Sequence, residues 1–90
     1  MLNLYRKQLS LMGQRLKVAR VLAGYRSAAS FASTNGFKIT TYQRHESGKK
    51  EASLFTLMNY CKTLNISLIW LLTGLESHFK RPFEYLDEIK

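Results

Sequence analysis

The hydrophobic residues of this chain recur every three to four positions, which is the spacing of one face of a helix, and alternation of the strand type is nearly absent. A weak alternation at 37–42 has no second segment with which it could pair. The pattern therefore predicts an all-α fold, a compact domain of five short helices. The helical segments cover residues 11–23, 27–36, 39–46, 53–65 and 67–74.

Capping residues mark the ends of these segments. A serine hydroxyl suits a helix N-terminus because it accepts a hydrogen bond from a backbone N–H of the first turn, and Ser27, Ser53 and Ser67 stand at such positions. Glycine tolerates the left-handed conformation that often follows a helix, so Gly24 predicts the end of the first segment. Asn35-Gly36 predicts the end of the second segment for the same reason.

Three segments carry specific packing expectations. In 11–23, the basic residues Arg15, Lys17 and Arg20 fall outside the apolar stripe and are expected at the surface, and Gly13 stands near a candidate segment end. The segment 67–74 is apolar almost all round, so it should be buried. The inward stripes of the first and fourth segments consist of Met12, Leu16, Ala19 and Ala23, and of Leu54, Leu57, Met58, Cys61 and Leu64.

The length of 90 residues suits one domain. Residues 11–74 are expected to form it, while residues 1–10 either extend the first helix or make a basic arm. Residues 75–90 are expected to be a tail in which Pro82 precedes a short amphipathic helix with Phe83, Leu86 and Ile89 on one side. Such a helix could pack on its own domain or serve as a dimerisation element.

The charge of the chain narrows the choice of partner. There are 14 Lys and Arg against 6 Asp and Glu, a net charge of +8. Residues 1–50 hold ten of the basic residues and a single acidic residue, Glu46. This lopsided field favours an anionic partner, namely nucleic acid, an anionic membrane surface or an acidic protein, over solubility alone.

Several classes of protein and site are not expected. No apolar run is long enough to cross a membrane, and the N-terminus lacks the apolar core of a secretory signal. The single cysteine, Cys61, cannot form an internal disulfide, which indicates a cytoplasmic protein, and it is expected to be a buried thiol. His45 and His78 have no further ligands at metal-binding spacing. We expect no catalytic constellation, no metal, no cofactor and no small-molecule ligand.

The second and third segments have the layout of a helix-turn-helix, two short helices joined by a turn that contains glycine. In 39–46, helical spacing separates Tyr42 and His45 from an outer row of four residues. Arg suits guanine, Gln suits adenine, and Thr offers a hydroxyl or a methyl group to a base edge. The alternative is a polar face that is merely solvated. The outer row consists of Ile39, Thr40, Gln43 and Arg44.

Three stretches resemble the Cro/C1-type (XRE) helix-turn-helix family over about residues 12–74: "GQRLKVAR", "TTYQRHESGKK" and "LMNYCKTLNISLIWLLTG". "YQRHESGKK" and "LNISLIWLLTG" are the most specific parts, and "GYRSAASFA" together with "TTYQRHESG" is similar to a prophage-repressor branch. The resemblance implies a lambda-repressor-like domain that binds double-stranded operator DNA as a homodimer and regulates transcription, most often as a repressor. It also implies a bacterial or phage protein that acts at the nucleoid.

Carried over by position, the resemblance makes 39–46 the recognition helix. Thr40, Gln43 and Arg44 would then contact bases, and Ile39 would contact a thymine methyl group. Glu46 would form a structural ion pair with Arg20 across the domain rather than accept a hydrogen bond from cytosine. Phosphate contacts would come from Ser27, Ala28, Lys38, Lys49 and Lys50.

Two departures from the family pattern affect this set of contacts. Many relatives have a phosphate-contacting Gln where this chain has Ala28, which has no polar side chain. The sequence "TTYQ" fits a capping box, so Thr40 could cap its helix and leave base contacts to Gln43 and Arg44.

A function of another class also stays open, a protein-interaction module such as an antitoxin-type or anti-repressor partner that does not read DNA. Binding to a membrane surface is a third, weaker alternative.

Overall fold

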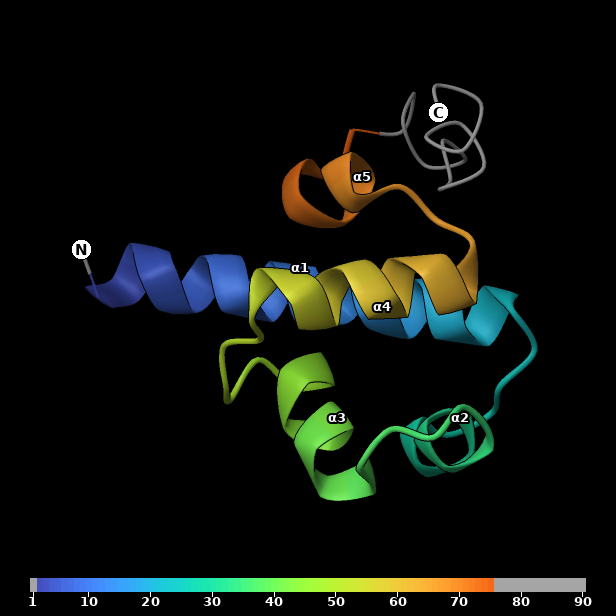
Figure 1. Cartoon of the computed structure of the whole chain (residues 1–90). Coiled ribbons are helices and arrows are strands. Elements are labelled where there is room, and N and C mark those ends of the chain that lie inside the picture. Colours follow the sequence, from blue (N-terminus) through green and yellow to red (C-terminus); the bar gives the residue numbers. More distant parts are fainter. Residues whose placement is uncertain (1, 76–90) are drawn as a thin grey trace. The chain divides into compact units, whose positions relative to one another are not determined.

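The computed structural model describes residues 2–75, and within this range the chain contains five α-helices and no β-strand (Figure 1). The all-α prediction is confirmed. The described residues fall into two compact units, one ending at Glu51 and one beginning at Ala52, so the boundary lies inside the segment 11–74 that the sequence treated as one domain. The tail helix predicted around Phe83 lies outside the described residues. The helices are α1 (Leu2–Leu22), α2 (Ala28–Thr34), α3 (Ile39–Glu46), α4 (Leu54–Leu64) and α5 (Leu68–Thr73).

Helix α1 is the long helix of the first unit. It begins at Leu2, so residues 2–10 extend the helix and do not form a separate arm. Leu16 and Ala19 are buried as expected, whereas Met12 is only partly buried. The expectation that Ala23 would face inward is wrong, because α1 ends at Leu22 and Ala23 is exposed in the following turn.

Helices α2 and α3 enclose the aromatic core of the first unit. The ring of Phe31, on α2, lies 4.8 Å from the ring of Tyr42, on α3, measured between centroids. Tyr25 and Phe37, in the connections on either side of α2, place their rings 5.2 and 5.7 Å from that of Phe31. Aromatic pairs at such distances add to the stability that their buried area provides. The turn between α2 and α3 is therefore fixed by core packing on both sides.

The caps of α2 and α3 differ. The Ser27 hydroxyl accepts a hydrogen bond from the backbone N–H of Ser30 at 3.0 Å, and the Ser30 hydroxyl accepts one from the backbone N–H of Ser27 at 3.4 Å, which completes a capping box. Helix α3 has Lys38 at its N-cap, with no side-chain hydrogen bond there. The alternative in which Thr40 caps this helix is wrong, because Thr40 lies inside the first turn.

The second unit consists of α4 and α5, which contact each other. The Ser53 hydroxyl accepts from Thr56 N–H at 3.1 Å, and the Ser67 hydroxyl accepts from Ile69 N–H at 3.0 Å, so both predicted serine caps are present. Asn65 ends α4 in the left-handed conformation, with φ of 58°. Asn adopts this conformation more readily than other residues with a Cβ atom. The connection between the two helices is consequently short and well defined.

Two predictions about burial in the second unit are wrong. Ile69 and Leu72 are 51% and 45% exposed, so α5 is amphipathic and not buried all round. A helix of six residues makes fewer than two turns, and Trp70 and Leu71 occupy its buried side. On α4, Leu54 is exposed and Tyr60 takes a place in the buried stripe.

Candidate nucleic-acid interface

Helix α3 separates a buried side from an exposed side. Tyr42 and His45, three residues apart, are buried against the first unit. The four residues of the outer row are all exposed to solvent, as the sequence predicted. A short helix with one face fixed in the core holds its outer side chains in a defined register. We call this set the reading row: Ile39, Thr40, Gln43 and Arg44.

A buried ion pair holds the C-terminal end of α3 against α1. Arg20 donates from Nε to Glu46 Oε2 and from Nη2 to Glu46 Oε1, both at 2.9 Å, and from Nη1 to the carbonyl oxygen of Tyr25 at 2.8 Å. Arg20 is only 4% exposed, so the expectation from the helical pattern that it lies at the surface is wrong, and the pairing implied by the family resemblance is what the structure contains. The hydrogen bonds to Glu46 raise the pKa of Arg20, against the opposing effect of burial.

The hydrogen bonds of this ion pair offset the cost of removing its charges from water. Two parallel N–H···O bonds match the planar guanidinium to the planar carboxylate, and the third contact uses a further guanidinium donor. Removing Glu46 would leave the buried Arg20 charge without compensation, which is destabilising. The pair therefore fixes the distance and the rotation of α3 relative to α1.

Two glycines allow the backbones of α1 and the α3 end to touch. A Cβ atom on Gly13, in the middle of α1, would overlap the carbonyl oxygen of Glu46 and lie 2.9 Å from its carbonyl carbon. A Cβ atom on Gly48, just after α3, would lie 2.9 Å from the Cα atom of Ser10, and Gly48 also has a positive φ of 76°. The α3 end is thus in backbone contact with α1 at two places.

Sequence reasoning missed the role of Gly13, which it placed near a segment end. A signal was present, since glycine in a helix interior is about 1 kcal/mol less favourable than alanine and needs a compensating reason.

The two lysines after α3 lie at its C-terminal cap. The backbone N–H groups of Lys49 and Lys50 donate to the Arg44 carbonyl oxygen at 2.9 and 3.3 Å, and both side chains are exposed. The hydroxyl of Tyr5, near the start of α1, donates to Glu51 Oε2 at 2.8 Å. The segment that carries the lysines is therefore attached to α3 at one end and to α1 at the other.

The remaining predicted phosphate contacts lie at the starts of α2 and α3. Lys38 is exposed immediately before the reading row. Ser27 is exposed, but its hydroxyl oxygen already accepts the capping hydrogen bond of α2. Ala28 is partly buried and offers a methyl group only. Of the five predicted phosphate contacts, the three lysines thus present charge to solvent.

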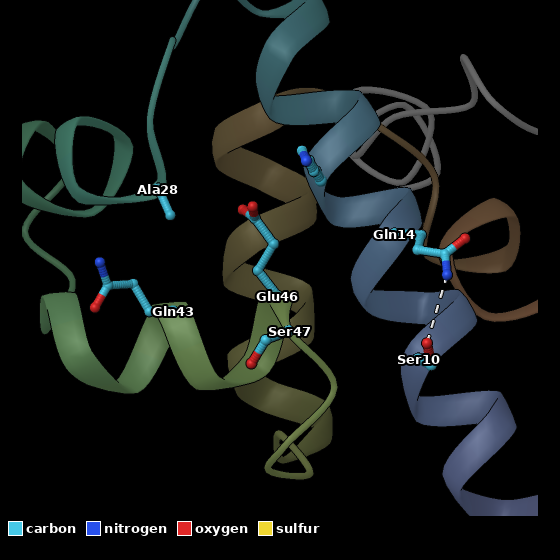
Figure 2. Close-up of a pocket in the computed structure, with 7 residues that line it drawn as sticks. Ser10, Gln14, Ala28, Gln43, Glu46 and Ser47 are labelled. Atoms are coloured by element: carbon cyan, nitrogen blue, oxygen red, sulfur yellow. Dashed lines mark hydrogen bonds between the residues drawn. The ribbon is translucent and has the colours of Figure 1, made fainter.

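A pocket of about 350 Å³ lies between α1 and α3 and reaches the start of α2 (Figure 2). In Figure 2, Gln43 projects from α3 toward Ala28 on one side, and Ser10 and Gln14 lie on α1 across from them. The amide of Gln14 donates to the Ser10 hydroxyl at a long 3.4 Å. The sequence did not single out the α1 residues of this pocket as a site. Its lining comprises Ser10, Gln14, Lys17, Ala28, Gln43, Glu46 and Ser47.

Three other kinds of site were considered in the part of the chain that the structure describes: a reactive thiol, a metal site and a membrane-spanning helix. Cys61 is buried, and burial raises the pKa of its thiol to about 12, which keeps it protonated and unreactive. Residues 2–75 contain no group of three potential metal ligands. None of the helices formed by these residues has the length and apolar character needed to cross a membrane. His78, considered above as a metal ligand, lies outside this range.

Comparisons of the chain with protein-family models, with curated proteins and with solved structures gave no match. Any function assigned to this chain therefore rests on its own residues and on their arrangement.

Proposed function

We propose that this protein is a sequence-specific regulator of transcription that binds double-stranded DNA and inserts α3 into the major groove. The observation that carries the proposal is the reading row, an exposed set of side chains on a helix whose opposite side is buried. A B-DNA major groove admits one α-helix, and its base edges present donors, acceptors and thymine methyl groups.

The side chains of the reading row have complementary chemistry for base edges. Arg44 can donate two hydrogen bonds to guanine O6 and N7, and Gln43 can pair with adenine N6 and N7. Thr40 and Ile39 supply a hydroxyl and apolar surface at the N-terminal end of the helix. The ion pair of Arg20 with Glu46 supports the proposal indirectly, since base reading requires a helix held in one orientation.

Basic residues on either side of the reading row suit the DNA backbone. Lys38 precedes α3, and Lys49 and Lys50 follow it, all with exposed side chains. Such residues add affinity that depends on salt concentration but carry no sequence information. The resemblance to Cro/C1-type regulators supports the same function and favours a repressor that binds as a homodimer.

The proposal is tested by selecting bound duplexes from a random pool at two salt concentrations. We expect a defined motif and, for a dimer, two half-sites about 34 Å apart. Arg44→Ala should weaken binding to the selected duplex by about 1–3 kcal/mol, which is about fivefold to 150-fold, and relax the preference at one position. Lys49→Ala should weaken binding to all duplexes alike.

Lys62→Ala is a matched control, since it removes the same charge from an exposed position on α4. A selected motif that is unchanged by Arg44→Ala would show that the reading row is wrongly assigned. Feeble binding without sequence preference by the unaltered protein would contradict the proposal and favour a protein-interaction module.

A further inference from the structure

We infer that the pocket between α1 and α3 is a subsite for a phosphate group, in which Lys17 supplies the positive charge. This inference rests on the proposed function and extends it to a contact by α1 that lies outside α3 and its flanking segments. The phosphate could belong to the DNA backbone or to a free nucleotide, and the chemistry of recognition is the same in both cases.

The lining of the pocket suits a polar anion and not an apolar ligand. Small-molecule sites are usually lined by apolar and aromatic residues, whereas six of the seven residues that line this pocket are polar or charged and the seventh is Ala28. Hydroxyl groups come from Ser10 and Ser47, and amide groups come from Gln14 and Gln43. These groups can donate hydrogen bonds to phosphate oxygens.

Existing hydrogen bonds leave most of these donors available. The bond from Gln14 to Ser10 is 3.4 Å long and within one helix, so an anion could displace it at little cost. Ser47 donates to the Arg44 carbonyl oxygen at 3.2 Å, a bond that its hydroxyl can exchange by rotation.

The charge balance of the pocket is positive although Glu46 contributes to its wall. Both carboxylate oxygens of Glu46 accept hydrogen bonds from Arg20, so this pair is neutral as a unit. Lys17, which lines the pocket and is exposed, adds a charge that the pair does not cancel. An anion that enters the pocket therefore meets one net positive charge, and the Glu46 carboxylate is already occupied.

The position of the pocket favours the DNA backbone as the source of the phosphate. Gln43 belongs to the reading row and also lines the pocket, where Figure 2 shows its side chain. A phosphate in the pocket would thus lie beside a side chain proposed to contact bases. This is the place expected for the sugar-phosphate strand of DNA that borders the major groove. A volume of about 350 Å³ lies at the lower end of the range for small-molecule sites.

The first arm of the test uses the selected duplex and the variant Lys17→Gln, with Lys62→Gln as the charge-matched control. If the DNA backbone occupies the pocket, Lys17→Gln reduces the slope of log affinity against log salt by about one and leaves the selected motif unchanged. Lys62→Gln leaves the slope as it is. Thermal melts of both variants check that the fold is retained.

The second arm titrates the full chain with inorganic phosphate and with deoxyadenosine monophosphate, observed by NMR. If free nucleotides occupy the subsite, backbone amide signals of Ser10, Gln14 and Ser47 shift, and Lys17→Gln abolishes the shifts. The inference is overturned if Lys17→Gln behaves like Lys62→Gln on DNA and neither ligand shifts these signals. If the unaltered protein binds duplexes without sequence preference, that result counts against the proposed function. The titration with phosphate and nucleotide would still test the pocket.

Discussion

Replacing Gly13 with alanine tests the contact that holds α3 on α1. In an unconstrained helix interior this substitution is stabilising by about 1 kcal/mol, because alanine is the better helix former. In this structure the added Cβ would overlap the carbonyl oxygen of Glu46 and would lie 3.1 Å from the carbonyl oxygen of His45. All of these atoms are backbone, so no side-chain rotation relieves the overlap.

The expected net effect is destabilising. Overpacking of a close contact costs about 1–3 kcal/mol. A shift of α3 away from α1 would also stretch the hydrogen bonds between Arg20 and Glu46, and bonds between charged groups contribute about 1.5–3 kcal/mol each. After the gain in helix propensity is subtracted, the free energy of unfolding should fall by about 2–3 kcal/mol. For a chain of this size that corresponds to a fall in melting temperature on the order of 10 °C.

Thermal and urea unfolding followed by circular dichroism would measure this effect. Val18→Ala is the control, because Val18 is exposed on the same helix and alanine there improves helix propensity without a clash. We expect the control to melt at or slightly above the temperature of the unaltered protein. A Gly13→Ala variant as stable as the unaltered protein, or more stable, would refute the close backbone contact between α1 and α3.

Two further predictions concern groups that pack beneath the reading row. Glu46→Gln should lower the free energy of unfolding by about 1.5–3 kcal/mol, because the amide keeps one acceptor for Arg20 but removes the negative charge and the second acceptor. A loss below about 1 kcal/mol in urea unfolding would mean that the pair is not a main anchor. Burial, with a smaller effect of Lys50, lowers the pKa of His45 from its ordinary value of 6.5, so the unfolded chain takes up a proton more readily than the folded one. The stabilisation that depends on neutral His45 is therefore complete above pH 6.5 and is lost as the pH falls below it. Melting temperatures measured at about pH 7.5 and about pH 5.5 should show this loss of stability. If a His45→Gln variant loses as much stability between these two pH values, the loss belongs to other groups.

Features set by neighbouring residues could be predicted from the sequence. The bounds of α3 and the serine caps of α2, α4 and α5 follow the prediction, because caps and glycine stops act within one turn. The composition of the reading row follows from the same local rule, since the period of a helix decides which side chains share a face.

Features that depend on distant residues could not be predicted from the helical pattern. Arg20 has the polarity of a surface residue, and only its partner 26 positions away explains its burial. Gly13 lies inside α1 because the backbone of α3 occupies the space of a side chain. The pocket that includes Lys17 arises where α1, α2 and α3 meet, a junction that exists only after folding.

The backbone contacts between the end of α3 and α1 do not involve the exposed side chains of α3. The contacts at Gly13 and Gly48 involve main-chain atoms, which every residue of α3 possesses regardless of its side chain. Outward positions such as Thr40 and Arg44 can therefore be exchanged without disturbing how the helix is mounted. The exposed surface of α3 can therefore change in sequence while the two glycines and the Arg20–Glu46 pair stay as they are.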